Sequence, residues 1–294
     1  MSSGHEGRPH VIKPAWLKRR IPAGATYQDV HGILQRNKVY TICQEARCPN
    51  LGECFSRGTA TFLILGDRCT RNCRFCAVAH GPIGPPDPEE PWRVAEAVKC
   101  MGLGHVVVTS VTRDDLFDGG AGHFAETIRE IRCRAPKARI EVLVPDFQGS
   151  NRALTTIVQA RPDVLNHNLE TVPRLYPKVR PGADYGRSLH LLKRGRESSR
   201  NIPTKSGLML GLGESPEEVR QVLIDLLEVD CRILTLGQYL QPSRDHLPVE
   251  RFVAQEEFRQ WREIALELGF RAVAAGPFVR SSYQAEELYE ASRT

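Results

Sequence analysis

Six short apolar runs, separated by helical patterns, constrain the fold of this chain more than any other feature. Their apolar residues occupy consecutive rather than alternate positions, which is typical of strands buried on both faces of a parallel sheet. The runs cover residues 61–65, 105–111, 139–144, 163–169, 206–212 and 232–240. Six such strands alternating with helices predict right-handed βαβ units, and no GxGxxG fingerprint follows the first strand. We therefore expect an α/β fold with a partial (β/α)6 barrel, an incomplete relative of the TIM barrel.

The helical patterns between the runs support this alternation. Ser215 opens the sequence SPEE, which is a capping box with proline at the first helical position. A second helix is expected from about Gln255 to Leu268, with Gly269 available as its left-handed cap. We therefore expect helices at both of these places in the chain.

Two stretches lie outside the alternation, and each is too short to bury a core of its own. We expect an N-terminal extension over residues 1–58, a barrel over residues 59–275 and a C-terminal tail over residues 276–294. Both extensions should pack on the barrel.

The composition excludes several classes of protein. With 294 residues, 41% of them hydrophobic and 26% charged, the chain is neither disordered nor a disulfide miniprotein. No apolar run approaches the roughly 18 residues that a membrane span needs, so we expect a soluble protein without a membrane partner. The net charge of +5 is spread along the chain without an aromatic-interleaved basic motif, so we expect no nucleic-acid partner. The basic N-terminus lacks the apolar segment of a secretory signal, which favours a cytoplasmic location.

Six of the nine cysteines lie between positions 43 and 76. They form two triplets, which are Cys43, Cys48 and Cys54, and then Cys69, Cys73 and Cys76. A reducing compartment disfavours disulfides, so this clustering indicates metal binding. The second triplet has the spacing CxxxCxxC and follows the first expected strand, at the carboxyl end where barrels place active sites. Three thiolates suit zinc or an iron–sulfur cluster, but structural zinc takes four ligands, whereas three on a four-iron cube leave one iron open.

A CxxxCxxC after the first barrel strand, with Phe75 before the last cysteine, resembles the radical S-adenosylmethionine (SAM) superfamily. The resemblance implies that Cys69, Cys73 and Cys76 hold a [4Fe-4S] cluster whose open iron chelates the amino and carboxylate groups of SAM. One electron from that cluster would then cleave the sulfonium to methionine and a 5′-deoxyadenosyl radical. These three cysteines are therefore expected to be catalytic as well as metal ligands.

The two triplets together resemble the lipoyl synthase family. The upstream triplet, in CQEARCPNLGEC, has the spacing CxxxxCxxxxxC, and six further stretches are similar to that family. They are GDRCTRNCRFCAVAHG (66–81), VTSVTRDDLFDGG (108–120), LNHNLETVPRLYPKVRPGADY (165–185), PTKSGLMLGLGE (203–214), LTLGQYLQPSRDHLPVERFV (234–253) and GPFVRSSY (276–283). The resemblance covers nearly everything from about residue 25 to residue 285.

This resemblance implies an activity, its cofactors and its partners. In the family, two sulfur atoms are inserted at C6 and C8 of an octanoyl group held in amide linkage to a lysine of a carrier protein. Those C–H bonds are unactivated, so a radical is needed to break them. The implied cofactors are SAM and two [4Fe-4S] clusters, the second of which, on the upstream cysteines, is the sulfur donor. The implied partners are octanoylated lipoyl domains of 2-oxoacid dehydrogenases, the glycine cleavage H protein, an electron donor such as flavodoxin or ferredoxin, and an iron–sulfur carrier protein.

The fourth ligand of the second cluster is implied to come from the RSSY motif at residues 280–283. We assign it to Ser282, with Ser281 as the alternative. An alkoxide is a harder ligand than a thiolate and should be lost more easily when the cluster gives up sulfide. Without the resemblance, both serines would be interpreted as a turn or a helix cap. Gln284 departs from the family pattern, in which His often follows RSSY.

SAM needs further polar contacts from other strand ends, and these are assigned by position in the fold. The residues expected to contact SAM are Thr109, Asn168, Glu170 and Ser206. Glu170 is a partner for the SAM ammonium, and the glycines between 207 and 213 allow close backbone approach.

Other residues receive structural interpretations. We interpret Asp114 and Asp115 as residues of a helix N-terminus, in preference to a role in contacting the substrate. The cysteines outside the triplets, Cys100, Cys133 and Cys231, are interpreted as buried small hydrophobes or inert thiols.

Two alternative functions stay open at this point. One is another radical SAM enzyme that inserts sulfur, such as a biotin synthase-like enzyme, although biotin synthase lacks the upstream CxxxxCxxxxxC. The other is a zinc-stabilised binding protein with two three-cysteine sites. The zinc protein would be colourless, whereas the iron–sulfur enzyme would be brown and oxygen-sensitive.

Overall fold

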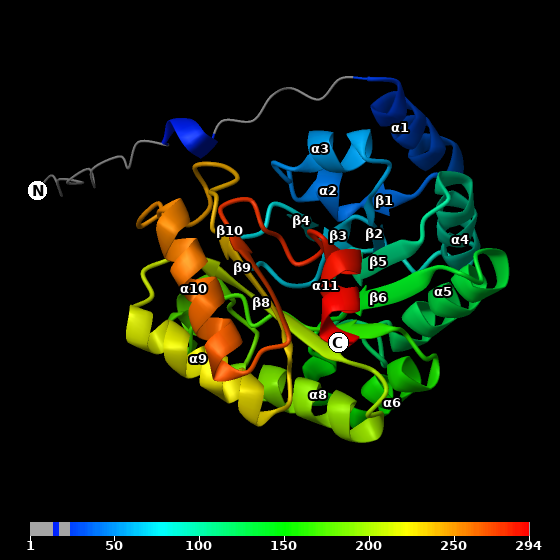
Figure 1. Cartoon of the computed structure of the whole chain (residues 1–294). Coiled ribbons are helices and arrows are strands. Elements are labelled where there is room, and N and C mark those ends of the chain that lie inside the picture. The colour runs from blue at the N-terminus through cyan, green and yellow to red at the C-terminus, as the bar shows by residue number, and fades with distance from the viewer. Residues whose placement is uncertain (1–13, 18–23, 294) are drawn as a thin grey trace, which may run out of the picture.

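The expected alternation of strands and helices is present in the computed structural model, which describes residues 14–17 and 24–293 (Figure 1). The six expected strands are β2 (Thr61–Ile64), β5 (His105–Ser110), β6 (Arg139–Leu143), β7 (Val164–Asn166), β8 (Thr204–Leu210) and β9 (Ile233–Gln238). They lie side by side in chain order, and each pairs in parallel with the next. The α/β partial barrel is therefore confirmed.

The sheet continues beyond these six strands at both edges. A further strand, β10 (Ala272–Gly276), pairs in parallel with β9, and the short β1 (Tyr40–Thr41) pairs antiparallel with β2. Among the described residues the barrel thus has seven parallel strands rather than six, and the N-terminal extension adds an edge strand. The sequence AVAAG of β10 consists mostly of alanine and glycine, with one β-branched residue, Val273, and no aromatic residue, so it carries little of the composition that marks a strand.

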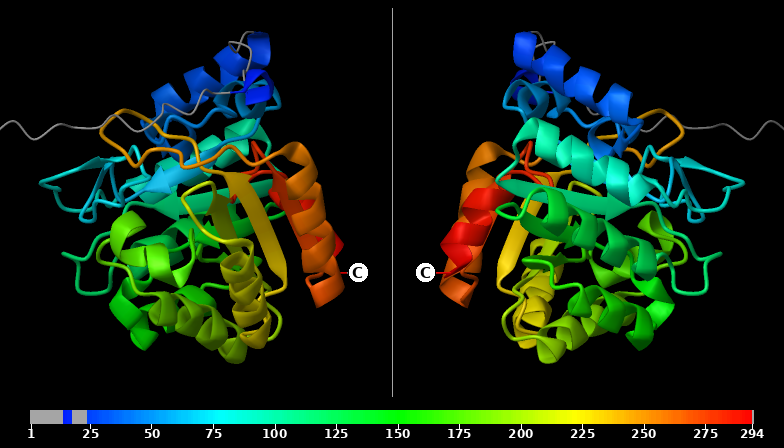
Figure 2. Two further views of the ribbon diagram at one scale, coloured as in Figure 1. Left: turned by 90° about the vertical axis from the view of Figure 1, so that its left-hand side faces the viewer. Right: turned by 90° about the vertical axis from the view of Figure 1, so that its right-hand side faces the viewer.

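Helices cover the outer face of the sheet (Figures 1 and 2). They are α4 (Glu90–Met101), α5 (Ala121–Arg134), α6 (Asn151–Gln159), α8 (Tyr185–Ser198), α9 (Pro216–Glu228) and α10 (Gln255–Leu268). The expected capping box is present at α9, where the Ser215 hydroxyl accepts from Glu218 N and the Glu218 carboxylate accepts from Ser215 N. Gly269 ends α10 in the left-handed conformation, as its position predicts.

The N-terminal extension forms a small helical layer on one edge of the barrel. Its helices are α1 (Ala25–Asn37), α2 (Ile42–Glu45) and α3 (Leu51–Ser56), preceded by a short 3-10 turn, η1 (Ala15–Leu17). Figure 1 shows them grouped beside β1, β2 and α4. Leu34 and Phe55 are buried in this contact, which attaches the layer to the barrel core.

The remaining elements lie at the two ends of the strands. A two-residue parallel ladder, β3 (Arg68–Cys69) with β4 (Ala79–His80), follows β2. The turns η2 (Phe147–Gly149) and η3 (Pro173–Leu175) and the short α7 (Tyr176–Val179) follow β6 and β7, and α11 (Ala285–Arg293) ends the described chain. Figure 2 shows the β3–β4 ladder projecting on the side opposite the end of α11.

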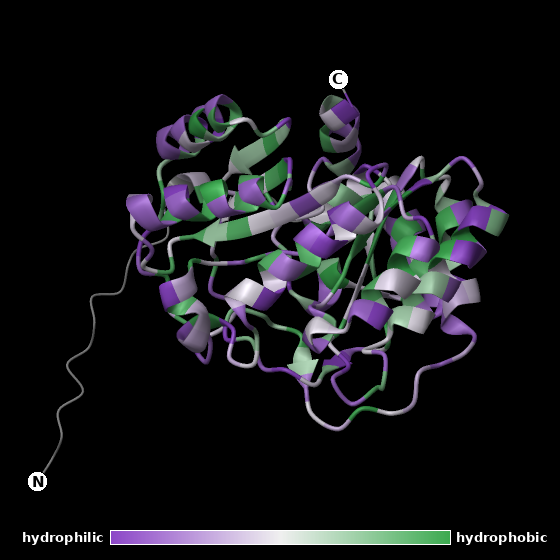
Figure 3. Ribbon diagram, turned by 90° about the horizontal axis from the view of Figure 1, so that it is seen from below, coloured by the Kyte–Doolittle hydropathy of each residue, from purple (hydrophilic) through white to green (hydrophobic). Residues whose placement is uncertain are grey.

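The core lies between the sheet and its helices, and also inside the barrel. Every residue of β2 and of β9 is buried, which agrees with their mainly apolar sequences and includes the polar side chains of Thr61, Thr235 and Gln238. Figure 3 shows the strands as mainly hydrophobic and the outward faces of the helices as mainly hydrophilic. Within the part of the chain that the structure describes, no helix is long and apolar enough to cross a membrane.

Candidate active site

The CxxxCxxC loop begins where the chain leaves β2 through a strained residue. Leu65 adopts a left-handed conformation with φ of 68°, and its backbone N–H donates to the buried Glu90 carboxylate at 2.7 Å. The same Glu90 oxygen lies 2.7 Å from His123 Nε2 on α5. These buried contacts thus fix the direction in which the backbone leaves β2 and enters the cysteine loop.

The first cysteine of this loop is held by backbone donors. Cys69 ends β3, and its Sγ accepts from the backbone N–H groups of Arg71 at 3.4 Å and Thr112 at 3.2 Å. Thr112 belongs to the loop after β5, so the sulfur lies at the carboxyl end of two adjacent strands. The position expected from the sequence is therefore observed.

Arg71 fastens the loop to the barrel. Its guanidinium donates to Asp114 at 2.6 and 2.9 Å and to Asp146 at 2.6 Å, in the loops after β5 and β6. Burial alone would raise the pKa of Asp146, but hydrogen bonding and charge from Arg71 lower it to about 2. The carboxylate is therefore ionised, and the clamp is a charged one at neutral pH.

The assignment of Asp114 and Asp115 to a helix N-terminus is wrong. Asp114 binds Arg71, and Asp115 accepts from the buried Arg113 at 2.8 Å. Helix α5 begins later, and Asp118 accepts from the two N–H groups of Gly120 and Gly122 at that end. The spacing of Asp114 and Asp115 in TRDDL does not distinguish an ion pair from a helix cap. Their basic partners are Arg71, which is far away in sequence, and the adjacent Arg113.

The far end of the CxxxCxxC loop is held by two other loops. His246, after β9, lies with its Nε2 2.9 Å from the carbonyl oxygen of Cys76. Leu247 N donates to Arg74 O at 3.1 Å, and Arg74 N donates to Val179 O at 3.0 Å. The loop is thus anchored to four other segments of the barrel mouth, which fixes where the three sulfurs lie.

The sulfurs of the second triplet lie in one electrostatic environment. Burial raises the pKa of Cys76 to about 12 and also raises that of Cys73. The charges of Cys69 and Glu170 add to both rises, whereas the Arg180 guanidinium opposes the rise at Cys73. These thiols are protonated in the metal-free chain, so binding of iron must release protons.

The upstream triplet is gathered by the short helices of the N-terminal extension. Cys43 lies on α2 and Cys54 on α3, and Cys48 lies between them with its N–H donating to Cys43 O at 3.0 Å. Burial, then the charge of Cys48, raises the pKa of Cys43 to about 12, while hydrogen bonds from Thr61 oppose that rise. Burial and Cys48 likewise raise the pKa of Cys54 to about 11. The three thiols therefore lie close enough to interact.

The two serines of RSSY lie in different places. Ser282 Oγ accepts from Thr61 Oγ1 at 2.8 Å, and Thr61 is the residue that hydrogen-bonds Cys43. Ser281 Oγ instead lies between Asn166 and Asn168 on the barrel side. Ser282 is therefore the serine placed beside the upstream triplet. Burial lowers the pKa of Arg280, and the charges of Cys48 in the upstream triplet and of Glu170 after β7 oppose that fall.

Of the four residues expected to contact SAM, Thr109, Asn168 and Glu170 lie at or just beyond the carboxyl ends of β5 and β7, whereas Ser206 lies in the first half of β8. Their side chains are engaged differently. Thr109 Oγ1 donates to Leu143 O at 3.0 Å, and the fully buried Ser206 Oγ accepts from Leu169 N at 3.2 Å. Asn168 Nδ2 donates to Glu170 Oε1 at 2.9 Å. Glu170 has a left-handed backbone with φ of 67°, and burial raises its carboxyl pKa against the opposing charge of Arg180. Asn168 and Glu170 thus form the more suitable pair for a polar ligand.

The residues present fit both cofactors by their chemistry. All six triplet cysteines are free thiols, a soft donor set suited to iron–sulfur clusters. Across residues 14–17 and 24–293, no three His, Cys, Asp or Glu side chains are arranged as ligands of a single metal ion. Near the carboxyl ends of β5 and β7, the buried atoms Ser110 Oγ and His167 Nε2 have no hydrogen-bond partner among the described residues. Burial and the nearby Arg180 charge lower the pKa of His167 to about 4, so its ring is neutral and suited to accept from a polar ligand.

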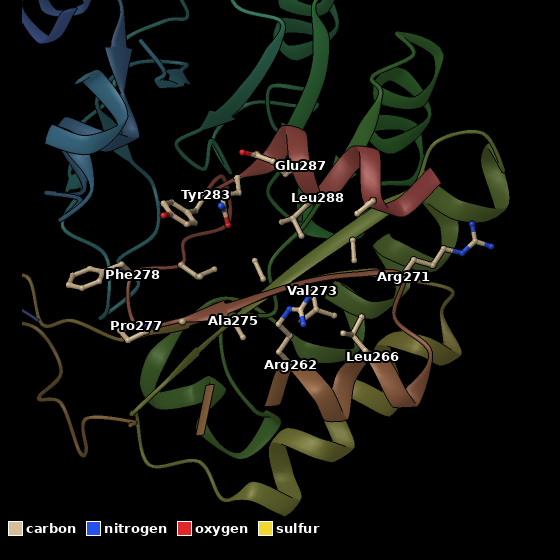
Figure 4. Close-up of a pocket in the computed structure, with 16 residues that line it drawn as sticks. Arg262, Leu266, Arg271, Val273, Ala275, Pro277, Phe278, Tyr283, Glu287 and Leu288 are labelled. Carbon is tan, nitrogen blue, oxygen red and sulfur yellow. The ribbon is translucent and has the colours of Figure 1, made fainter. Parts of the chain in front are cut away.

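A cavity of about 530 Å³ lies outside this site, along the free edge of β10 between α10 and α11. Figure 4 shows Val273 and Ala275 on β10, Leu266 on α10 and Leu288 on α11 around it. Tyr283 of RSSY also lines it. The segment that carries the two serines therefore has the cavity on one side and the cysteine sites on the other.

Comparison with known proteins places the fold and site in one class. The profile of the radical SAM superfamily matches residues 63–226, more than half of the chain. A solved structure of HydG, a maturase of the [FeFe]-hydrogenase, superposes with a TM-score of 0.59 at 16% identity, over 91% of this chain and 67% of that one. Methylornithine synthase superposes with a TM-score of 0.55 at 16% identity, over 84% of this chain and 74% of that one. Likenesses at this identity show the fold, and the matching profile makes the chain a radical SAM protein.

Closer relatives narrow the class. The profile of the N-terminal domain of lipoyl synthase matches residues 4–48. The lipoyl synthase of Desulfotalea psychrophila is 58% identical over 279 residues, which are 95% of this chain and 93% of that protein. That of Caldanaerobacter subterraneus is 56% identical over 94% of this chain and 96% of that protein. The chain belongs to the lipoyl synthase family of radical SAM enzymes, which insert sulfur with SAM and [4Fe-4S] clusters and act on lipoyl carrier proteins.

The structure also contains positioning residues that the sequence patterns did not single out. They are Glu90 at the exit of β2, Arg71 within the cysteine loop, His246 after β9, and the buried pair Glu141 and Lys205 inside the barrel. Only the buried pair had a visible signal, which is a single charge inside an otherwise apolar strand. The other three are recognisable only once their distant partners are in place.

Proposed function

We propose that the two triplets divide the work of sulfur insertion. Cys69, Cys73 and Cys76 hold the cluster that binds SAM, and the upstream cysteines hold a second cluster that supplies the sulfur. The observation that carries this division is the position of Ser282, 2.8 Å from Thr61, which in turn hydrogen-bonds Cys43. At the upstream site, three thiols and one nearby serine hydroxyl supply four ligands. At the other site, the three cysteines supply only three.

The chemistry that the first cluster supplies when bound is one-electron cleavage of SAM, which provides a radical able to abstract hydrogen from C6 or C8 of the octanoyl chain. The residues of the chain bind and orient the reactants for it. Asn168 and Glu170 present an amide and a carboxyl to the ligand beyond the end of β7. Thr109 bonds to Leu143 at the end of β6, and Ser206 of β8 holds the backbone at Leu169, between Asn168 and Glu170. The neutral His167 leaves one ring nitrogen as a hydrogen-bond acceptor inside the same region.

Ser282 is proposed as the fourth ligand of the second cluster. An oxygen ligand is bound less tightly than a thiolate to iron that is already rich in sulfur, so Ser282 would supply the most labile ligand of a cluster held there. The Ser282 hydroxyl is held by Thr61 before any metal binds, which limits the rearrangement needed for ligation.

We also propose specific carrier proteins, an electron donor and a cellular location. We propose that the octanoyl groups come on lipoyl domains of 2-oxoacid dehydrogenases and on the glycine cleavage H protein. Electrons would come from a flavodoxin or ferredoxin, and an iron–sulfur carrier protein would rebuild the second cluster. The free thiols of the nine cysteines support a reducing compartment such as the cytoplasm. The division into residues 1–58, 59–275 and 276–294 remains our proposal for the domain organisation.

Cysteine variants test the division directly. Anaerobically reconstituted protein should hold about eight iron and eight sulfide per chain. Replacing Cys43, Cys48 and Cys54 with Ala should leave about four of each, preserve SAM cleavage to 5′-deoxyadenosine and abolish sulfur insertion. Replacing Cys69, Cys73 and Cys76 should also leave about four but abolish SAM cleavage.

The matched control is Cys100→Ala, which removes an exposed thiol outside both triplets and should change none of these readouts. The division is contradicted if the upstream triple variant still inserts sulfur, or if it loses SAM cleavage while keeping four iron per chain.

A further inference from the structure

The segment between β10 and α11, residues 277–284, joins parts of the molecule that are far apart in sequence; we call it the closing segment. Asn50 of the N-terminal extension donates to Phe278 O at 2.6 Å. Arg280 donates to Gln238 O at the end of β9 at 3.2 Å, and Ser282 contacts Thr61 on β2. The closing segment thus contacts both edges of the open barrel.

Inside the barrel, the closing segment takes part in one continuous row of hydrogen bonds through Ser281. Asn166 Nδ2 donates to Ser281 Oγ at 2.7 Å, and Ser281 Oγ donates to Asn168 Oδ1 at 2.9 Å. Asn168 Nδ2 then donates to Glu170 Oε1 at 2.9 Å. Ser281 therefore bridges two asparagines that are two residues apart on the same strand-end segment.

The donor and acceptor roles along this row follow from the Glu170 carboxyl oxygen, which is an acceptor. The Glu170 carboxyl oxygen accepts, so the amide of Asn168 must turn its NH2 group toward it and its oxygen toward Ser281. Ser281 must then donate its single hydrogen to Asn168 and accept from Asn166. At the other end, Asn166 Nδ2 also donates to Glu141 Oε1 at 2.8 Å, which is paired with Lys205 Nζ at 2.9 Å. A single hydroxyl in the middle completes the row, and only a side chain able to donate and accept at once can do so.

The surroundings of Asn168 leave its amide little freedom. A Cβ at Gly207 would lie 3.0 Å from Asn168 Oδ1 and 2.5 Å from Thr235 Oγ1. On the other side, the closing segment is pressed against β9, where a Cβ at Gly237 would lie 2.1 Å from Val279 O. The amide of Asn168 is therefore held between the bare Cα of Gly207 and the Ser281 hydroxyl.

We propose that Ser281 is a positioning residue for SAM: it fixes the amide of Asn168, and through it the carboxyl of Glu170, in the orientation that binds the cofactor. Because Ser282 follows directly and lies beside the upstream triplet, the geometry of the SAM site depends on the closing segment being seated at the sulfur-donor site. This inference rests on the proposed roles of Asn168 and Glu170 and adds a specific residue that couples the two sites.

The test is a double-mutant cycle on the reconstituted full-length enzyme, with SAM affinity measured by anaerobic equilibrium dialysis. Ser281→Ala should raise the SAM dissociation constant about fivefold, because the hydrogen bond that orients the Asn168 amide is lost together with the bond from Asn166. Asn168→Ala should raise it at least as much, and the double variant no further than Asn168→Ala alone, because the two residues act in series. Ser281→Thr keeps the hydroxyl and should stay within about twofold of the parent.

Iron content and melting temperature are measured on the same samples. Iron content should be unchanged in Ser281→Ala, and the melting temperature should fall only by the few degrees expected for two lost hydrogen bonds. A general structural role would lower both readouts further and would be additive in the cycle. The matched control is Ser198→Ala, at an exposed serine of α8, which should leave SAM affinity unchanged.

The possible failures are distinguishable. Parental SAM affinity in Ser281→Ala, with weaker binding in Asn168→Ala and Glu170→Gln, overturns the role of Ser281 and leaves the proposed SAM site standing. Additive losses in the double variant also overturn it. Parental affinity in both Asn168→Ala and Glu170→Gln refutes the proposed SAM contacts, and the role of Ser281 with them.

Discussion

The buried ion pair inside the barrel allows one prediction to be worked through in detail. Lys205 Nζ lies 2.9 and 3.1 Å from the two carboxylate oxygens of Glu141, and both side chains are 1% exposed. Lys205→Met removes the cation but leaves the carboxylate in the core, where the amide of Asn166 still donates to it and His105 Nε2 lies 3.7 Å away. Breaking a fully buried pair in this way costs about 3–5 kcal/mol. For a chain of this size, that corresponds to a loss of roughly 10 °C in melting temperature.

The loss should depend on pH, with a sign that follows from the carboxylate. In the parent, burial tends to raise the pKa of Glu141 and the Lys205 charge outweighs it, so the pKa is lowered. Without Lys205, burial raises the folded-state pKa above the unfolded value of about 4.3. A carboxyl with a raised folded pKa destabilises fully above that pKa and less as pH falls toward the unfolded value. The variant should therefore lose more stability at pH 8 than at pH 5.5. His105, whose Nε2 is 3.7 Å from Glu141, is the other titratable group facing this carboxylate.

The assay is anaerobic thermal unfolding of parent and variant, matched for iron content, at pH 8 and pH 5.5. The double variant Glu141→Gln/Lys205→Met removes the orphaned charge and keeps an acceptor for Asn166, so it should recover at least half of the loss and show no added pH dependence. Two results would refute the argument that an uncompensated carboxylate is the cause. One is a melting temperature of Lys205→Met equal to that of the parent at pH 8; the other is an equal loss of melting temperature at pH 8 and pH 5.5.

Three further predictions concern the cysteine sites. Ser282→Cys should keep both clusters and SAM cleavage but block sulfur insertion, because a thiolate is a less labile ligand; normal turnover, measured as lipoyl product by mass spectrometry, would remove Ser282 from that role. Gly207→Ala should weaken SAM binding in equilibrium dialysis, because the new Cβ displaces the Asn168 amide; unchanged affinity would contradict the close approach. Glu90→Ala should lower both the melting temperature and the iron held by the CxxxCxxC loop, because the Leu65 N–H loses its buried acceptor at a cost of about 1–3 kcal/mol; iron retention equal to the parent would contradict this.

The fold was predictable wherever burial left a strong pattern. Strands β2 and β5 to β9 are apolar at consecutive positions, so each is recognisable without its neighbours. Strand β10 is not, because four of its five residues are alanine or glycine; Ala272 and Ala274 pack with Leu288 of α11 and Ile233 of β9. A strand made of small side chains shows neither the alternating apolar–polar pattern nor the run of bulky apolar residues by which strands are recognised in a sequence. The edge strand β1 is two residues long, which is too short to produce a pattern.

The convergence of each cysteine triplet was predictable for a different reason. Metal ligands close in sequence need only a short loop to converge, so their spacing is itself the signal. The residues that hold the loop work over long sequence separations: Arg71 reaches Asp146, and His246 reaches the carbonyl of Cys76. Such partners are common charged or polar residues, and nothing local distinguishes them from a solvated surface.

The pair Ser281 and Ser282 shows where local reasoning ends. Both are serines in the same turn, and either hydroxyl satisfies the chemistry of a labile iron ligand. What separates them is the set of partners that the fold brings to each: Thr61 and Cys43 to Ser282, and Asn166 and Asn168 to Ser281. If Ser282 leaves its position when sulfide is lost, the strain falls first on its neighbour in the row that ends at Glu170. With the proposed roles of Ser281 and Ser282, a turn with two adjacent hydroxyls, one at each site, would be the shortest covalent link by which loss of sulfide at the upstream site could alter SAM binding.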